Sequence, residues 1–123
     1  RQALRRIRGA RIVYTNSPLH YAEGVLRLLH IDDLFDAVYS IEHTGFRPKP
    51  SLAGFRILIE RERLDPWRSV LVDDTLGNLR AARRLGLRTV WVTRDPRSPA
   101  FVDAKIATIL SLPRIASRMG NGC

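Results

Sequence analysis

The feature that most constrains the fold is an alternation of continuous apolar runs with segments of helical spacing. The runs "ARIVYT" (Ala10–Thr15), "SVLVD" (Ser69–Asp73) and "RTVWV" (Arg88–Val92) are the clearest of them. Strands that are apolar on both faces are typical of a parallel sheet buried between helices. The sequence therefore predicts an α/β protein with a three-layer, Rossmann-like parallel sheet and helices on both faces.

Helices are predicted between these strands from capping residues and apolar spacing. Ser17 and Pro18 are typical of a helix start, and apolar residues recur after them at helical intervals. The stripe that we expect to face the core consists of Ala22, Val25, Leu26 and Leu29. The other predicted elements are a helix over residues 1–9, a strand at Asp36–Ile41, a helix at Ser51–Arg63 with Leu52, Phe55 and Ile59 inward, a helix at Leu76–Leu85, and a weaker strand at Ala104–Leu110.

The chain of 123 residues is long enough for one domain. We assign residues 1–113 to a core domain and residues 114–123 to a C-terminal tail. No apolar run approaches the roughly 18 residues that a membrane span needs, so no membrane partner is expected. The single cysteine, Cys123, allows no internal disulfide, which favours a reducing, cytoplasmic location.

The net charge of +9 raises the question of a nucleic-acid partner. The arginines are scattered along the chain, and no aromatic residues alternate with them as a base-stacking surface would require. The pattern therefore argues against nucleic acid and indicates a general preference for arginine over lysine.

Two adjacent acids, Asp73 and Asp74, follow the apolar run "SVLV". A single acid here would be read as a cap for the next helix, with Asp74 or Thr75 as the capping residue. Two acids repel each other, and Mg²⁺ bound by carboxylates and phosphate oxygens would relieve that repulsion. Together with Asn78, four residues after Asp74, the pair predicts a hard-cation site.

Two further groups stand at predicted strand ends or in the loops that follow them. Thr15 and Asn16 could donate hydrogen bonds to an anion, although a simple helix cap at Ser17 explains the same residues about equally well. Lys49 lies between two prolines in "RPKP", which would hold its ammonium in a fixed direction. The alternative for Lys49 is a solvated surface lysine.

The order Thr15, Lys49, then Asp73 and Asp74 resembles the haloacid dehalogenase superfamily of phosphohydrolases. "IVYTN" is similar to the family's second motif, "RPKP" to its third, and "VLVDDTLGNLRAARRLGLRTVWV" to its fourth, over residues 9–113. The stretches "TNSPLHYAEGVLRLLHIDDLFDAV" and "FRPKP" look most like the pyrimidine 5′-nucleotidase-like branch.

The resemblance implies a Mg²⁺-dependent phosphomonoester hydrolase that works through an aspartyl-phosphate. Thr15 would bind the transferring phosphoryl group with Asn16 beside it, and Lys49 would stabilise the same group. The implied substrate is a small phosphorylated metabolite, with a nucleotide as one candidate.

For the metal, the resemblance implies that Asp74 is the direct Mg²⁺ ligand. Asp73 would lie near the ion through water or Lys49, and Asn78 would steady the loop.

The family's first motif, D-x-D-x-T/V, which carries the nucleophilic Asp, has no counterpart before "YTN". The opening "RQALRRIRGA" looks like the last helix of the cap that precedes the second motif. We therefore expect a C-terminal core segment, inactive by itself, whose central first strand and cap are missing. The missing strand would lie between those carrying Thr15 and Asp73, so a missing N-terminal segment or a second chain would complete the sheet.

Two other readings use the same residues. A non-catalytic phosphate-binding or interaction domain that has lost its first motif remains open. A signalling receiver domain is set aside, because there the acid pair comes first and the lysine last.

Overall fold

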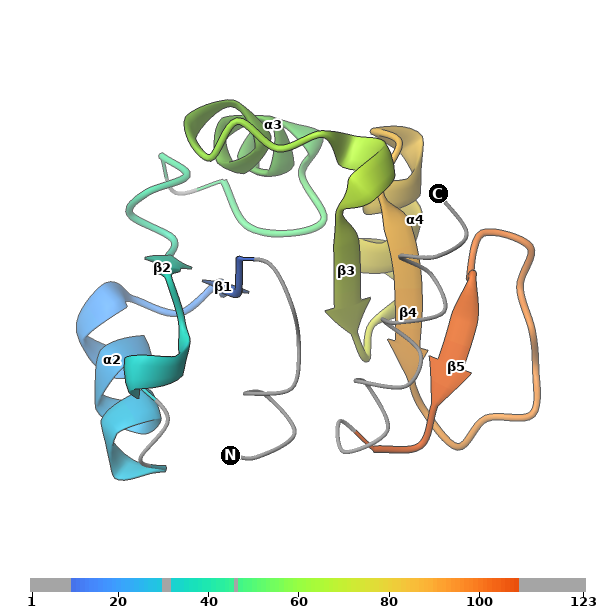
Figure 1. The fold of residues 1–123 in the computed structure, drawn as a ribbon, viewed down its shortest axis with the longest axis horizontal. Helices are drawn as coiled ribbons and strands as arrows, with labels where there is room; N and C mark the ends of the chain where they lie inside the picture. The colour runs from blue at the N-terminus through green and yellow to red at the C-terminus, as the bar shows by residue number, and fades with distance from the viewer. Residues whose placement is uncertain (1–9, 30–31, 46, 109–123) are drawn as a thin grey trace.

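The computed structural model describes residues 10–29, 32–45 and 47–108. Parallel strands alternate with helices through these residues, which confirms the predicted α/β class (Figure 1). The elements are β1 (Ile12–Tyr14), α2 (Leu19–Leu28), the 3₁₀ turn η1 (Asp32–Leu34), β2 (Ala37–Tyr39), α3 (Leu52–Arg61), the 3₁₀ turn η2 (Pro66–Arg68), β3 (Val70–Asp73), α4 (Leu76–Arg84), β4 (Arg88–Val92) and β5 (Ala104–Ile106).

The strands form two separate parallel sheets rather than one. β1 pairs with β2 in the register Val13 to Val38, and the second sheet has the order β3-β4-β5 (Figure 1). Within the described ranges no strand lies between β1 and β3, and the two do not pair. A break between these strands is what the family resemblance leads us to expect.

Both strands beside this break carry apolar side chains that are only partly covered. All three residues of β1 are partly exposed, and Val70 of β3 is 37% exposed. By contrast, β4 is paired on both sides, and its Val90 is fully buried. Inner strands of a parallel sheet are normally buried on both faces, so β1 and β3 have the composition of inner strands but the exposure of edge strands.

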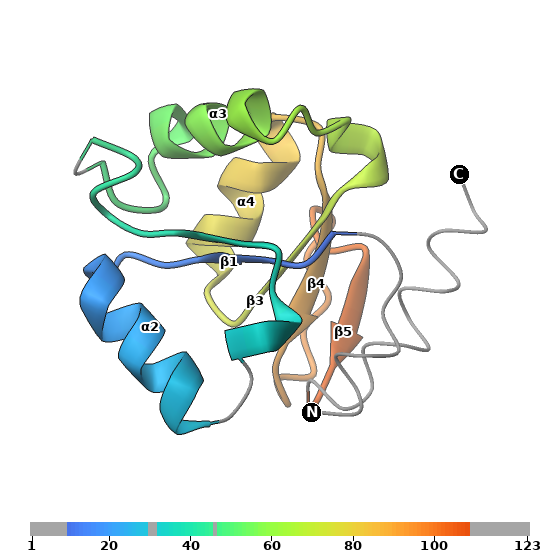
Figure 2. The same cartoon turned by 60° about the vertical axis from the view of Figure 1, so that its left-hand side comes forward.

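One hydrophobic cluster connects the two sides of the break. Phe55 of α3 packs with Ala81 and Ala82 of α4, and the two helices lie beside each other (Figure 2). Tyr14 of β1 and Leu71 of β3 both pack against this cluster. One shared apolar layer therefore joins the two sheets even though their strands do not pair.

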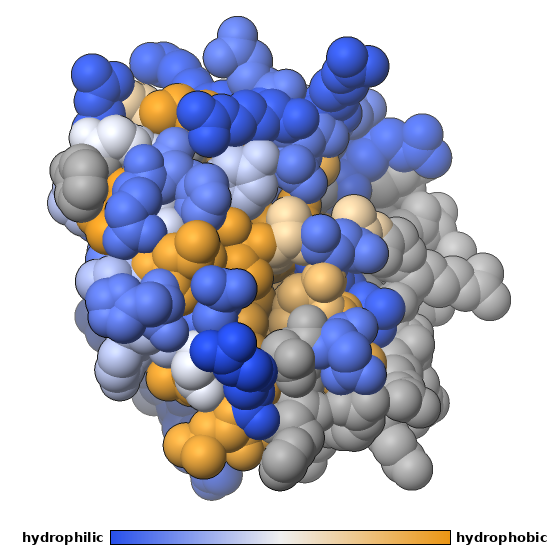
Figure 3. All heavy atoms as spheres, turned by 90° about the vertical axis from the view of Figure 1, so that its left-hand side faces the viewer, coloured by the Kyte–Doolittle hydropathy of each residue, from blue (hydrophilic) through white to orange (hydrophobic). Residues whose placement is uncertain are grey.

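Helix α2 flanks the small sheet, and its buried face is narrower than predicted. Ala22 and Leu26 are buried, but Leu29 is 59% exposed and Val25 is 36% exposed. Leu29 lies beyond the last turn as the C-cap residue, so the expected stripe is wrong at its C-terminal end. Figure 3 views the molecule from the left-hand side of Figure 1, where α2 lies, and shows hydrophobic residues (orange) gathered on that side.

Several element boundaries differ from those predicted. The second strand is three residues long, and the fifth ends at Ile106. Pro18, not Ser17, is the N-cap residue of α2, and its side chain makes no capping hydrogen bond; the Ser17 N–H donates to Thr15 Oγ1 (3.1 Å). The predicted helix over residues 1–9 and the tail at residues 114–123 lie outside the described residues, and the domain limits stay a prediction. No helix in the described part of the chain is both long and apolar enough to cross a membrane.

A close contact between α3 and β1 gives a stability prediction. A Cβ at Gly54 would collide with the Tyr14 hydroxyl and lie 2.9 Å from the Arg47 carbonyl oxygen, whereas at Gly24 nothing lies within 4 Å. Gly54→Ala should lower the free energy of unfolding by about 1–3 kcal/mol because it overpacks this contact. Gly24→Ala, the matched control in α2, should raise it by up to about 1 kcal/mol. Urea unfolding of both variants, made in a protein that also supplies the missing strand, measures the difference.

The same contact can be relieved from the other side. The Tyr14 hydroxyl is buried without a hydrogen-bond partner among the described residues. Tyr14→Phe should therefore be nearly neutral alone and recover part of the loss in the double variant with Gly54→Ala. Strictly additive losses in the double variant would contradict the contact.

Candidate active site

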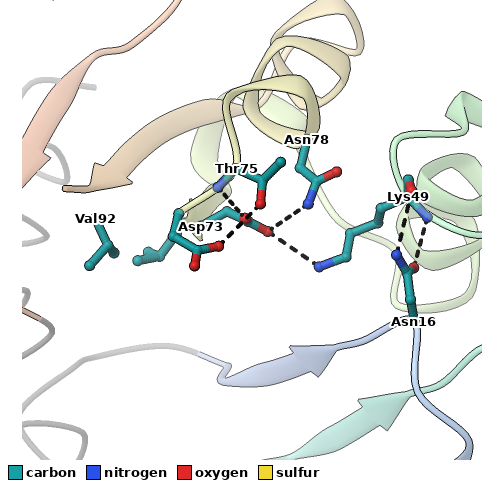
Figure 4. A pocket seen from close by; sticks show the side chains of 8 residues that line it. Asn16, Lys49, Asp73, Thr75, Asn78 and Val92 are labelled. Carbon is teal, nitrogen blue, oxygen red and sulfur yellow. Dashed lines mark hydrogen bonds and ion pairs between the residues drawn. The ribbon is translucent and has the colours of Figure 1, made fainter. Parts of the chain in front are cut away.

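The carboxyl ends of β1 and β3 and the loop before α3 meet at one cavity of about 470 Å³ (Figure 4). This is where ligands bind in open α/β sheets. Five of the six residues singled out from the sequence line it, and the sixth, Thr15, is adjacent in the chain to Asn16. The lining residues are Asn16, Lys49, Val72, Asp73, Asp74, Thr75, Asn78 and Val92.

Lys49 connects the two sheets at this cavity. Its Nζ donates to the Tyr14 carbonyl oxygen of β1 (3.0 Å) and to Asp73 Oδ2 of β3 (3.2 Å). The side chains of Lys49 and Asp73 are only 11% and 8% exposed, so this is a largely buried ion pair. An ammonium has three N–H donors, and two of them are used here, which leaves one for a ligand in the cavity.

The ring of Tyr14 lies under this ammonium. Lys49 Nζ is 5.0 Å from the ring centroid, within the range of a cation–π contact. Burial raises the pKa of the Tyr14 hydroxyl to about 12, so the phenol stays neutral at physiological pH.

Asn16 holds the main chain of Lys49 in place. The Lys49 N–H donates to Asn16 Oδ1 (2.8 Å), and Asn16 Nδ2 donates to the Lys49 carbonyl oxygen (3.4 Å). The residue next to it, Thr15, accepts a hydrogen bond from the Ser17 N–H, and its own hydroxyl hydrogen has no acceptor among the described residues. The structure therefore ties Asn16 to Lys49 and leaves the Thr15 hydroxyl free to donate.

Asp73 is fully bonded within the protein. Oδ1 accepts from the Thr75 N–H (2.8 Å), and Oδ2 accepts from Lys49 and from Asn78 Nδ2 (3.2 Å). Burial alone would raise the pKa of this carboxyl and is the largest single influence. The Thr75 N–H, the charge of Lys49 and the Asn78 amide together outweigh it and lower the pKa below its usual value.

Asp74 differs from its neighbour in exposure and in bonding. It is exposed, Oδ1 accepts only from the Thr75 hydroxyl (3.2 Å), and Oδ2 accepts no hydrogen bond from the described residues. Such a carboxylate suits a hard cation, which prefers oxygen ligands of this kind. No group of three or more acidic, His or Cys side chains gathers in the part of the chain that the structure describes.

Sequence reasoning did not single out Trp91, Val72 or Val92 for the site. The two valines form an apolar part of the cavity wall, which no polar motif signals. Trp91 is 4% exposed, and its indole N–H donates to the Asp74 carbonyl oxygen (3.1 Å). A buried indole N–H needs a hydrogen-bond acceptor. A Trp in an otherwise aliphatic strand could therefore have indicated a polar contact near the strand end.

The site thus combines a lysine, an acid pair and a free hydroxyl at one edge of a parallel α/β fold. Residues 1–86 match the family of haloacid dehalogenase-like hydrolases, and the chain belongs to that family.

Solved structures show the same fold. A magnesium-bound HAD-hydrolase from Bacillus subtilis superposes with a TM-score of 0.82 at 21% identity, over 94% of this chain and 53% of that one. A HAD phosphatase from Thermococcus onnurineus gives 0.78 at 28% identity, over 93% and 53%. The L-2-haloacid dehalogenase of Xanthobacter autotrophicus gives 0.83 at 17% identity, over 94% and 58%.

Curated relatives match over smaller shares of their own length. Validoxylamine A 7′-phosphate phosphatase from Streptomyces hygroscopicus subsp. limoneus is 26% identical over 94 residues, which is 76% of this chain and 44% of that protein. Drimenol cyclase drtB from Aspergillus calidoustus is 37% identical over 84 residues, 67% of this chain and 16% of that protein. The chain thus spans less than half the length of either relative.

The lowered pKa of Asp73 predicts a pH dependence of stability. Because the folded-state pKa lies below the ordinary value of 3.8, ionised Asp73 stabilises the fold above that pH. This contribution is lost as the pH falls through the lowered folded-state pKa. Asp73→Asn should therefore reduce the free energy of unfolding by about 1–3 kcal/mol near neutral pH, and by less as the pH is lowered. Urea unfolding across this range measures it.

The control for this prediction is an exposed acid away from the cavity. Glu60 of α3 has no side-chain hydrogen bond within the described ranges, and Glu60→Gln should change stability by less than about 0.5 kcal/mol. An Asp73→Asn effect that stayed constant down to the lowest pH would contradict the ionised, bonded state of Asp73.

Proposed function

We propose that this chain forms the C-terminal part of the catalytic core of a Mg²⁺-dependent phosphomonoester hydrolase. The observation that carries the proposal is the convergence of Asn16, Lys49 and the acid pair, which are far apart in sequence, on one cavity. Membership of the haloacid dehalogenase-like hydrolases and the likeness to a HAD phosphatase support the same reaction class.

In this proposal the chain supplies phosphate binding and charge stabilisation. The free hydroxyl hydrogen of Thr15 and the unused N–H of Lys49 donate to oxygens of the phosphoryl group. The hydroxyl of Thr15 and the ammonium of Lys49 would thereby stabilise the negative charge that spreads over these oxygens in the transition state. Asn16 keeps Lys49 in position through its two bonds to the Lys49 main chain.

The nucleophile lies outside this chain in our proposal. A carboxylate oxygen forms the new bond to phosphorus while the ester oxygen leaves and takes a proton, which gives an aspartyl-phosphate. Water then attacks the phosphorus, releases phosphate and regenerates the carboxylate. Among the described acids at the cavity, Asp73 is unsuited to this role because both its oxygens are already bonded.

Mg²⁺ would be held by Asp74 Oδ2, the carboxylate oxygen that accepts no hydrogen bond from the described residues. Asp73 would lie beside the ion, and Asn78 would keep Asp73 in place through its hydrogen bond to Oδ2. The ion would neutralise charge on the phosphoryl oxygens. Asp73 and Asp74 suit Mg²⁺, because Mg²⁺ sites in proteins commonly use one or two carboxylates together with waters and substrate phosphate oxygens.

The substrate we propose is a small phosphorylated metabolite. The name of the Streptomyces relative specifies a phosphate monoester of a small molecule, and the nucleotidase-like stretches make a nucleotide one candidate. The apolar wall formed by Val72 and Val92 would adjoin the non-phosphate part of such a ligand.

A second candidate is a non-catalytic phosphate-binding domain. It is favoured by the absence of a third acid near Asp73 and Asp74 within the described residues. The two candidates differ in one readout, because only the first hydrolyses a phosphomonoester once the sheet is complete.

We also propose a partner for the break in the sheet. One extended strand, running parallel to β1 and β3, would pair with both free edges and cover their partly exposed apolar side chains. The carboxyl ends of β1 and β3 both reach Lys49, so a carboxylate at the same end of the inserted strand would meet an ammonium there. Further sequence of the same protein or a second chain would supply the strand.

The metal-ligand assignment predicts the effect of Asp74→Asn. In a protein that contains this chain and the first motif, the substitution should reduce Mg²⁺-dependent hydrolysis of p-nitrophenyl phosphate at least about 100-fold. The fold should remain intact, because Asp74 is exposed and has one protein contact. Glu60→Gln is the charge-matched control. Undiminished activity in Asp74→Asn would contradict the assignment.

The strand proposal predicts how the 123-residue chain behaves alone. With two free inner edges it should associate or unfold over a broad range of urea, and sequence that supplies the strand should make the transition sharper. Analytical ultracentrifugation and urea unfolding, with and without that sequence, measure both effects. A sharp, cooperative transition of a monomeric 123-residue chain would count against the proposal.

A further inference from the structure

One peptide unit at the candidate site is held from both of its ends. The carbonyl oxygen of Asp74 accepts from the indole N–H of Trp91 (3.1 Å). The N–H of Thr75, on the other side of the same peptide bond, donates to Asp73 Oδ1 (2.8 Å). A peptide unit is rigid and planar, so fixing both its oxygen and its hydrogen fixes the direction of the chain on either side of it.

Trp91 is placed for this contact by the sheet. It lies opposite Asp73 in the β3–β4 register, next to the strand end that carries the acid pair. Its side chain is 4% exposed, which leaves little freedom to the indole. An indole N–H can only donate, and no other apolar side chain of similar bulk would supply that donor to the Asp74 carbonyl.

Asp74 needs such support because its carboxylate has little of its own. That side chain is exposed and has one hydrogen bond, from the adjacent Thr75 hydroxyl. Its direction is therefore set mainly by the backbone that carries it, and this backbone is the segment that Trp91 and Asp73 hold. Groups that orient a metal ligand commonly influence metal affinity as much as a ligand contact does.

We propose that Trp91 is a positioning residue for the acidic turn at residues 73–75: its indole N–H sets the Asp74–Thr75 peptide plane and thereby the direction of the Asp74 carboxylate. This inference rests on the proposed function for its metal-binding consequence, but its structural part does not need a metal. Trp91 is not one of the residues that line the cavity, so in this proposal it acts through the peptide.

The first test is amide hydrogen exchange without metal, on a protein that contains this chain together with the sequence that supplies the missing strand. In Trp91→Phe the ring remains but the donor is lost, so the Thr75 N–H should exchange roughly tenfold faster, as expected for one lost hydrogen bond. Trp67→Phe is the matched control, since Trp67 is the other tryptophan of the chain and is 59% exposed on η2. Unchanged Thr75 exchange in Trp91→Phe would overturn the inference. So would a uniform rise across β3 and β4, which would indicate a general packing role.

The second test is Mg²⁺ affinity by calorimetry on the same two variants and on Asp74→Asn. Trp91→Phe should bind Mg²⁺ roughly tenfold more weakly than Trp67→Phe, and Asp74→Asn should show no binding. Equal affinities of the two tryptophan variants would overturn the metal part of the inference. Binding that survives in Asp74→Asn would instead contradict the proposed ligand, and the exchange result for Trp91 would stand separately.

Discussion

The contact on which the described structure most depends is the ammonium of Lys49 between the two sheets. β1 and β3 share no strand hydrogen bonds, yet Lys49 Nζ bonds the Tyr14 carbonyl of one and the Asp73 carboxylate of the other. Because the charged groups are largely buried, loss of either partner would leave an unpaired charge out of water, which is costly. The same ammonium therefore aligns the strand ends and sets the charge at the cavity.

The use of lysine here follows from its shape. Of the 21 Lys and Arg residues, only Lys49 and Lys105 are lysines. Lys105 also serves several acceptors at once, since its Nζ donates to the carbonyls of Asp95, Pro96 and Arg97. A compact ammonium can meet acceptors that converge from different directions, whereas the planar guanidinium of arginine requires acceptors in its own plane. In a chain that otherwise prefers arginine, both lysines thus stand where one ammonium serves several acceptors, and only Lys49 joins separate segments by doing so.

The α/β class and the meeting of the polar residues at one edge of the sheet could be predicted from the sequence, and the reason is physical. Continuous apolar strands and the rule that parallel strands end at the same edge depend only on local pattern, so Lys49 and Asp73 could be placed together before any coordinates. What the pattern could not show was pairing between side chain and main chain. Asn16 proved to hold the Lys49 backbone, and Trp91 the Asp74 carbonyl, through contacts that depend on exact register and loop path. The exposed Leu29 was misjudged because helical spacing gives a face but not the length over which a neighbour covers it.

The acid pair shows why two adjacent carboxylates can coexist here. β3 ends at Asp73 and the chain bends at Asp74, and the two side chains part there: Asp73 turns inward to Lys49 and Asn78, while Asp74 is exposed. The positive charge of Lys49 is thus largely balanced by Asp73, and the excess negative charge of the pair lies on Asp74. A phosphate would meet donors on the Thr15 and Lys49 side and repulsion on the Asp74 side. Under the proposed function, a cation on Asp74 would remove that repulsion, and the phosphate oxygens would complete its ligands.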